Sequence, residues 1–180
     1  MGNRCQKHVF QSSRHRATVR IIQRYLSSGS RILEGGGGLG DVVHALNKVD
    51  YKVDGIDYAP KIVAAINESW PHLSVFEGDV RSIPVKDGHY DGYCSFGVIE
   101  HFADSYEAIA HEMKRVLRQG GYLFLSFPSF NRFRQSRAKA GKYVTTTLNP
   151  SDIPDFFQFA LDSEQIQAFY ESLGFELIEL

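Results

Sequence analysis

The chain has 180 residues, of which 43% are hydrophobic and 23% charged, and its formal net charge at pH 7 is −1. This length suits one domain that buries a core without disulfide staples. The near-zero net charge argues against binding of nucleic acid or membrane through overall charge. No apolar stretch reaches transmembrane length, and no signal-peptide pattern follows the basic N-terminus. We expect one cytoplasmic domain over residues 1–180.

The charges are segregated along the chain. Residues 1–33 hold seven Lys and Arg and no acid, and residues 131–142 hold five more and no acid. Residues 151–180 hold seven Asp and Glu and no Lys or Arg. Such blocks create local fields within a nearly neutral molecule. The two cysteines, Cys5 and Cys94, are too few for a disulfide framework, and no metal site is predicted.

Hydrophobic periodicity predicts helices that alternate with strands. The expected elements are a helix over 14–27, a strand over 31–34, a helix over 39–49, a strand over 51–57, a helix over 60–70, strands over 72–79 and 89–96, a helix over 103–118 closed by Gly120 and Gly121, a strand over 122–127, an irregular segment over 129–160, a helix over 163–173 ended by Gly174, and a strand over 175–180. This order predicts an α/β fold with a doubly wound, mostly parallel sheet and helices on both faces.

The run EGGGGLG, residues 34–40, lies between the first strand and a helix, and it fits two glycine patterns. One is the GxGxxG fingerprint of dinucleotide sites, which would use Gly35, Gly37 and Gly40. The other is the acid-x-G-x-G-x-G loop of S-adenosylmethionine binders, which would use Glu34, Gly36, Gly38 and Gly40. Four consecutive glycines satisfy either template, and a flexible turn or a tight packing site is the structural alternative.

Acidic residues close three successive strands and favour the second pattern. Glu34 suits a cofactor that carries a free ammonium, whereas a pyrophosphate would be repelled there. Asp57 can accept both hydroxyls of a ribose, or it can cap the next helix. Asp79 can accept the amino hydrogens of an adenine, or it can be a turn aspartate. Each acid alone is ambiguous, but three in these positions point to a ligand that carries an amino acid and a nucleoside.

Together these pieces resemble the class I, Rossmann-like S-adenosylmethionine-dependent methyltransferases. The matching segments are RILEGGGGLGD, VDGIDYAPKIV, VFEGDVRSIPVKDGHYDGYCSFGVIEHF, RVLRQGGYLFLSFPSFN and DFFQFALDSEQIQAFYESLGFELIEL. The resemblance implies a central first strand and a cofactor bound across the first four strands. The cofactor would be S-adenosyl-L-methionine, and the product S-adenosyl-L-homocysteine.

The resemblance also implies a role for individual residues. The implied cofactor contacts are Glu34 to the amino group, the backbone of Gly36, Gly38 and Gly40 to the methionyl part, Asp57 to the ribose, Tyr58, Asp79 and Val80 to the adenine, and the carbonyls of Ser95 and Phe96 to the methionine end. In this register Gly35 and Gly37 are interposed positions. Alanine should therefore be tolerated better at Gly35 or Gly37 than at Gly36 or Gly38.

The sequence defines the substrate site less closely than the cofactor site. A base is needed only if the acceptor must lose a proton. His101 is the candidate catalytic residue, with Glu100 beside it, and the alternative is that backbone partners satisfy His101. In this family an N-terminal helical cap (here 1–29) and the segment after strand five (here a basic and aromatic lid, 128–160) cover the substrate. We therefore expect a small-molecule acceptor with an acidic group, held by Arg132, Arg134 and Tyr143, unless these residues are merely solvated.

The sequence also leads to expectations about the acceptor, the sheet edge and the rival functions. No Asn/Asp-Pro-Pro-Tyr motif follows the fourth strand, which disfavours DNA adenine and glutamine as targets. Basic residues without interleaved aromatics make a weak case for nucleic acid. The family's final antiparallel strand is missing, so the chain is a short or truncated form whose open sheet edge predicts a homodimer. The rival functions are a non-catalytic binding module of the same fold and an NAD-dependent oxidoreductase.

Overall fold

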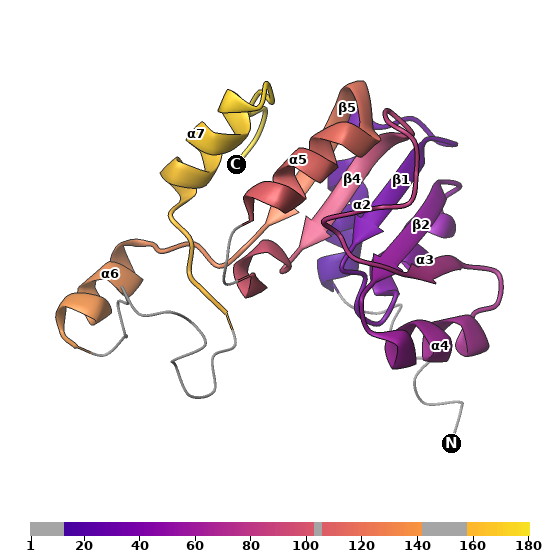
Figure 1. Ribbon diagram of the computed structural model, residues 1–180, viewed down its shortest axis with the longest axis horizontal. Coiled ribbons are helices and arrows are strands. Elements are labelled where there is room, and N and C mark those ends of the chain that lie inside the picture. Colours follow the sequence, from indigo (N-terminus) through magenta and orange to yellow (C-terminus); the bar gives the residue numbers. More distant parts are fainter. Residues whose placement is uncertain (1–12, 103–105, 142–157) are drawn as a thin grey trace. The chain divides into compact units, whose positions relative to one another are not determined.

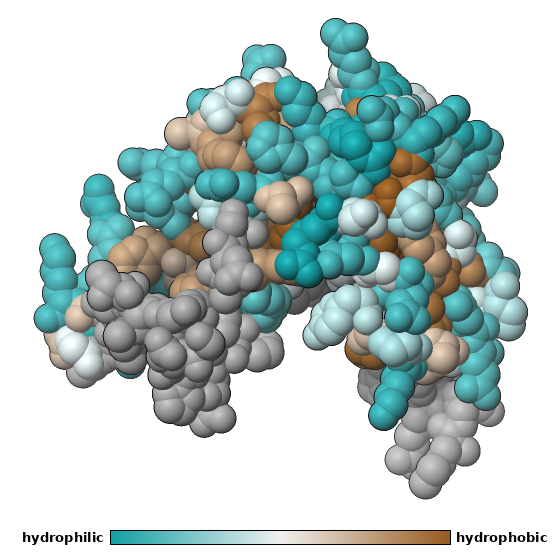
Figure 2. Space-filling model, viewed as in Figure 1, coloured by the Kyte–Doolittle hydropathy of each residue, from teal (hydrophilic) through white to brown (hydrophobic). Residues whose placement is uncertain are grey.

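The computed structural model describes residues 13–102, 106–141 and 158–180. The chain forms two compact units (Figure 1). The first comprises Met1–Phe96 and Glu112–Leu125, and the second comprises Gly97–His111 and Ser126–Leu180. Within the described ranges, no helix is long and apolar enough to cross a membrane. Figure 2 shows hydrophilic residues over much of the described surface on one face, with hydrophobic patches between them.

The first unit is built on a five-stranded sheet in the order β3-β2-β1-β4-β5. The strands are β1 (Arg31–Gly35), β2 (Lys52–Asp57), β3 (Ser74–Glu77), β4 (Tyr90–Phe96) and β5 (Leu117–Ser126). Strand β1 is central and pairs in parallel with β2 and with β4, and β2 pairs in parallel with β3. The strand order therefore reverses between β1 and β4, as expected for a doubly wound sheet with a central first strand.

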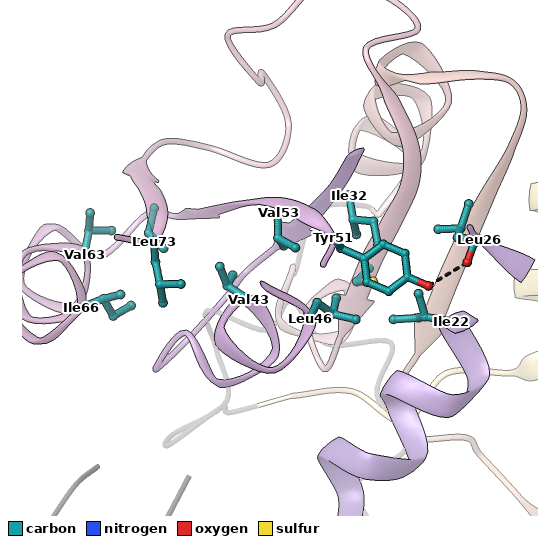
Figure 3. Packing of buried hydrophobic residues seen from close by; sticks show 12 residues of the cluster. Ile22, Leu26, Ile32, Val43, Leu46, Tyr51, Val53, Val63, Ile66 and Leu73 are labelled. Carbon is teal, nitrogen blue, oxygen red and sulfur yellow. Dashed lines mark hydrogen bonds between the residues drawn. The ribbon is translucent and has the colours of Figure 1, made fainter. Parts of the chain in front are cut away.

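One hydrophobic cluster joins this sheet to three helices, α2 (Ser13–Tyr25), α3 (Asp41–Asn47) and α4 (Pro60–Ser69). Figure 3 shows Ile22 of α2, Val43 of α3 and Ile66 of α4 around the buried strand residues Ile32 and Val53. Side chains alternate between the faces of a strand, so Leu33 and Tyr93 point to the opposite face. Helix α5 (Glu107–Val116) contributes Met113 and Val116, both fully buried, to the first unit.

A buried tyrosine fastens α2 to the sheet. Tyr51 is 4% exposed, and its hydroxyl donates a 2.7 Å hydrogen bond to the carbonyl of Leu26 (Figure 3). The Tyr51→Phe variant leaves this carbonyl without that donor, so we expect it to lose about 1.5 kcal/mol of unfolding free energy. Thermal denaturation should show a fall of about 4 °C. The control is Tyr58→Phe, whose ring is 82% exposed and whose melting temperature should not change.

The second unit contains the short helix η2 (Ile99–His101), the first part of α5, α6 (Arg132–Lys139) and α7 (Ser163–Ser172). Asn131 caps α6 by accepting a hydrogen bond from the amide of Arg134, at 3.0 Å. Asp162 caps α7 by accepting from the amides of Glu164 and Gln165. Gly174, at φ 90°, follows the end of α7, as the sequence predicts.

Two sequence predictions in the later part of the chain are wrong because local hydrogen bonds and packing override the pattern. Gly120 and Gly121 do not end a helix, since α5 ends at Val116 and both glycines lie within β5. A Cβ on Gly121 would lie 3.0 Å from the carbonyl oxygen of Asp91, so this glycine permits close approach of two backbones. The segment 129–160 is not wholly irregular, because Asn131 starts α6.

The strand expected over residues 175–180 is also not formed. These residues have no regular secondary structure, and the side chains of Ile178 and Leu180 are exposed. The amide of Phe175 bonds back to the carbonyl of Tyr170 and completes the end of α7. A strand requires a neighbouring strand to hydrogen-bond with. Among the described residues, none supplies that pairing for this segment, although its composition favours a strand.

Candidate functional site

The glycine run forms a loop between β1 and α3. Gly36, Gly38 and Gly40 have φ angles of 75°, 48° and 75°, in the left-handed region that favours glycine. The amides of Gly36 and Gly37 both donate to the carbonyl of Ile56 in β2, at 2.8 and 3.2 Å. A Cβ at Gly38 would meet nothing within 4 Å. The loop is therefore tied to the sheet at one end and borders open space at Gly38.

Gly35 has a different function from the other glycines of the run. It is the last residue of β1, and a Cβ there would lie 2.1 Å from the hydroxyl oxygen of Tyr93. The Tyr93 side chain is fully buried on β4. Tolerance of alanine at Gly35, which the register of the loop predicts, is therefore wrong, because the space for a methyl group is already filled. At Gly37 the nearest atom is Glu34 Oε2, at 3.3 Å, a tight contact with the end of a side chain, so tolerance of alanine there stays a prediction.

Glu34 lies beneath this loop. It is 5% exposed, and its Oε2 accepts a 3.2 Å hydrogen bond from the amide of Val43 in the first turn of α3. Burial raises the pKa of its carboxyl to about 8, partly offset by the bond from Val43 and reinforced by the charges of Asp41 and Asp57. A buried carboxyl of this kind becomes charged readily once a cation lies beside it.

Asp57 ends β2 and connects it to the loop. Its Oδ2 accepts a 3.0 Å hydrogen bond from the amide of Gly38, and its Oδ1 accepts from the amide of Ala59 at 2.9 Å. The N-cap of α4 is Ala59, and no side chain caps this helix, so Asp57 is not its cap. Each carboxylate oxygen has a further lone pair for an incoming hydroxyl. Tyr58, the next residue, is 82% exposed beside it.

Asp79 follows β3 and forms an ion pair with Arg81. The Arg81 guanidinium donates at 2.6 Å from Nη2 and 3.0 Å from Nε, and the Arg81 amide also donates to Oδ1. These side-chain hydrogen bonds lower the pKa of Asp79. The geometry is that of a turn aspartate, the alternative considered for this residue, and contact with an adenine stays a prediction. Val80, beside it, is buried.

Ser95 and Phe96 end β4. Ser95 is fully buried, and its Oγ has no hydrogen-bond partner among the described residues. Phe96 is partly buried and packs against the core cluster. A buried polar atom without a partner is uncommon in native proteins and frequently marks a binding or catalytic position. Ser95 lies at the same carboxyl edge of the sheet as Glu34 and Asp57.

The expected substrate residues belong to the second unit or lie outside the described part. His101 ends η2 and is exposed, whereas Glu100 is 2% exposed and its Oε2 has no hydrogen-bond partner among described residues. Arg132 is exposed at the start of α6, and the Arg134 guanidinium donates to the carbonyl of Ser129. Tyr143 lies outside the described residues. The sequence alone does not distinguish Glu100 from His101 as the candidate base, because the two residues differ in burial and the sequence does not show burial.

Comparison with known proteins identifies the family. The family model described as a methyltransferase domain matches residues 33–125, slightly more than half of the chain. A Mycolicibacterium smegmatis protein named as a probable S-adenosylmethionine-dependent methyltransferase is 30% identical over 150 residues, 83% of this chain and 53% of that protein. The Xenopus tropicalis tRNA (carboxymethyluridine(34)-5-O)-methyltransferase alkbh8 is 29% identical over 147 residues, 79% of this chain and 23% of that protein.

The chain therefore spans about half or less of the length of these curated relatives. Among solved structures, a protein in complex with the Trm112 methyltransferase activator of Haloferax volcanii has a TM-score of 0.69. It is 18% identical, and the match covers 92% of this chain and 70% of that one. This likeness shows the fold.

The site residues fit the cofactor of this family. The left-handed glycines are those of the acid-x-G-x-G-x-G register, the loop borders open space at Gly38, and Ser95 Oγ is buried without a hydrogen-bond partner among described residues. The buried Glu34 carboxyl suits a cationic amino group, so the NAD-dependent alternative does not describe this chain. Because the methyltransferase-domain model covers more than half of the chain, we conclude that it belongs to the class I, Rossmann-like S-adenosylmethionine-dependent methyltransferases.

Proposed function

We propose that this domain transfers the methyl group of S-adenosylmethionine to a small molecule that carries an acidic group. The observation that supports methyl transfer most directly is the loop at the carboxyl edge of β1, where three left-handed glycines lie above the buried carboxyl of Glu34. The bound cofactor supplies a methyl group on a sulfonium, which leaves as a neutral thioether. The chain therefore needs mainly to orient the reactants and exclude water.

Different residues of the first unit bind different parts of the cofactor. Glu34 accepts from the amino group, and the backbone of Gly36, Gly38 and Gly40 surrounds the methionyl part. Asp57 accepts from the ribose hydroxyls through the lone pairs that Gly38 and Ala59 leave open. Tyr58, Asp79 and Val80 contact the adenine, and the carbonyls of Ser95 and Phe96 contact the methionine end.

The preference for an acidic acceptor is supported by the charges of α6. This helix carries Arg132, Arg134, Arg137 and Lys139 and no acid. Arg134 is fixed to the carbonyl of Ser129, and Arg137 lies over the ring of Phe133 at 5.7 Å. Arg132 is exposed, so it is the better candidate to meet a carboxylate or phosphate. His101 is retained as the proposed base, with Glu100 as its buried alternative, for an acceptor that must lose a proton.

Charge reversal at Arg132 tests the acceptor. We expect Arg132→Glu to raise the KM for the acceptor about tenfold, because attraction becomes repulsion. The acceptor is found first by incubating the protein with methyl-labelled S-adenosylmethionine and a metabolite extract, and separating the labelled products by anion exchange. The affinity for S-adenosylhomocysteine should not change.

The matched control is Lys86→Glu, a charge reversal at an exposed residue of the first unit. It should leave both constants unchanged. Equal losses of acceptor and cofactor affinity in Arg132→Glu, or labelled products that are all neutral, contradict an acidic acceptor. No labelled product at all, with S-adenosylhomocysteine still bound, supports the non-catalytic module.

A second candidate acceptor is an acidic group on tRNA. The relative from Xenopus tropicalis is named for a carboxymethyluridine of tRNA, and it matches 79% of this chain. The same labelling experiment with total tRNA in place of the metabolite extract separates the two candidates. Label that enters tRNA and no small molecule favours this second function.

Partners are proposed on the same basis. The two edge strands of the sheet are β3 and β5, and an open edge can pair with a second copy of the chain. The likeness to a protein that binds the Trm112 methyltransferase activator makes an activator subunit the alternative partner. Light scattering of the purified chain measures whether it forms a homodimer.

A further inference from the structure

A second polar pocket lies at the opposite end of the sheet from the glycine loop. It has a volume of about 260 Å³ and is lined at the amino ends of three neighbouring strands, by Arg31 of β1, Lys52 and Asp54 of β2, and Ser74 of β3. Asn47, His72 and His89 complete the polar lining. All of these residues belong to the first unit. The proposed methyl-transfer site leaves this pocket without a function.

Two cations lie side by side in the pocket. Arg31 and Lys52 are register partners on adjacent parallel strands, about 4.8 Å apart along the hydrogen-bond direction. Neither side chain makes a hydrogen bond or ion pair with another described residue. The nearby acid Asp91 is already occupied, because its Oδ1 accepts from Arg118 Nε at 2.6 Å and its Oδ2 from the Arg31 amide at 2.8 Å.

The acid within the pocket is also committed. Asp54 Oδ2 accepts a 3.0 Å hydrogen bond from the hydroxyl of Tyr90, and burial together with the Asp54 charge raises the pKa of Tyr90. The last carbonyls of α3 accept hydrogen bonds from the following turn. The carbonyl of His44 accepts from the amide of Lys48, and that of Asn47 accepts from the amide of Asp50. The negative groups around the pocket therefore have hydrogen-bond partners. Among the described residues the side chains of Arg31 and Lys52 have none, although the charge of Arg31 helps to lower the pKa of Asp91.

The two histidines add donors. His89 Nδ1 is buried and has no hydrogen-bond partner among the described residues. His72 contacts His44 ring to edge at a centroid distance of 6.0 Å. Each imidazole carries at least one N–H donor from which an anion can accept a hydrogen bond.

We propose that this pocket binds the phosphate group of a small phosphate monoester, at a site separate from the methyl-transfer site. The guanidinium of Arg31 and the ammonium of Lys52 supply the charge, and His72, His89, Asn47 and Ser74 supply further donors. A volume of about 260 Å³ is below the range of pockets for drug-sized ligands, roughly 300–1,000 Å³. The ligand is therefore a phosphate with only a few carbon atoms attached.

The test is a nuclear magnetic resonance titration of the full chain at constant ionic strength. Inorganic phosphate, sulfate and glycerol 3-phosphate are the probes, and glycerol is the uncharged control. We expect saturable shifts at residues 31, 47, 52, 72, 74 and 89, with dissociation constants of about 1 mM for the three anions.

Matched variants decide whether the pocket is the binding site. Arg31→Gln and Lys52→Gln should each weaken glycerol 3-phosphate about tenfold. Lys61→Gln, which removes a charge from the first turn of α4, should not. All three should bind S-adenosylhomocysteine like the parent chain, so failure here is distinguishable from failure of the proposed function. Linear shifts without saturation, equal effects of the three variants, or binding of an RNA oligonucleotide but not of glycerol 3-phosphate would overturn the proposal.

Discussion

The Gly35→Ala variant is expected to lose about 3 kcal/mol of unfolding free energy, the largest stability effect in the glycine loop. Its new methyl group would lie 2.1 Å from the hydroxyl oxygen and 2.7 Å from Cζ of Tyr93. The tyrosine is fully buried on the neighbouring strand β4, so it has no free space to move into. Thermal denaturation should show a fall of about 9 °C.

Two controls separate this packing effect from a general sensitivity of the loop. Gly37→Ala should cost less than about 1 kcal/mol, because only the end of the Glu34 side chain lies near the new methyl group, at 3.3 Å. Combining Gly35→Ala with Tyr93→Val should cost less than the sum of the two single changes, because the smaller side chain makes room. Additive losses would show that Tyr93 does not restrict Gly35.

Cofactor binding is expected to release about 0.9 proton at pH 7, and the source is Glu34. With a pKa of about 8, its carboxyl is roughly nine-tenths protonated in the ligand-free protein at that pH. A ligand ammonium beside Glu34 favours the charged form and expels this proton. Calorimetric titration with S-adenosylhomocysteine in buffers of different ionisation enthalpy measures the number of protons released. The Glu34→Gln variant should release none and bind about 30-fold more weakly.

The same residue shapes the pH dependence of stability. Its ordinary pKa is 4.5, and its folded value is about 8. Between these values the unfolded chain gives up a proton that the folded chain keeps, so the fold loses stability as the pH rises through this window. At pH 7 the loss is about 3 kcal/mol. Unfolding of Glu34→Gln should lack this pH dependence, and an unchanged profile would show that Glu34 titrates normally.

The sequence was a good guide where local patterns and long-range structure agree. Pro60 marks the first turn of α4, Gly174 follows α7, and Asp57 ends the strand that was predicted to end there, whereas β1 runs one residue past Glu34, to Gly35. These features depend on backbone preferences and on hydrophobic periodicity, both of which can be read from a few neighbouring residues.

Features that depend on contacts between distant residues were not predictable. The sequence gives no sign that Tyr93 fills the space above Gly35, or that Arg81 holds Asp79. Gly120 and Gly121 look like a helix end in sequence, and only their position against β4 shows that they belong to a strand. Glu34 was predicted as a cofactor residue from its position before the glycines, but its high pKa depends on burial, which the sequence does not show.

The central position of β1 has a consequence for folding during synthesis on the ribosome. Strands β2 and β3 follow β1 closely, but the amide of Arg31 bonds to Asp91, 60 residues later in the chain. Because the ribosome adds about 5–20 residues per second, one edge of β1 has no partner strand for several seconds, until β4 has been synthesised. During that interval the half-sheet presents unpaired backbone groups, so a chaperone that covers strand edges would find its target at β1 rather than at the edges of the finished sheet.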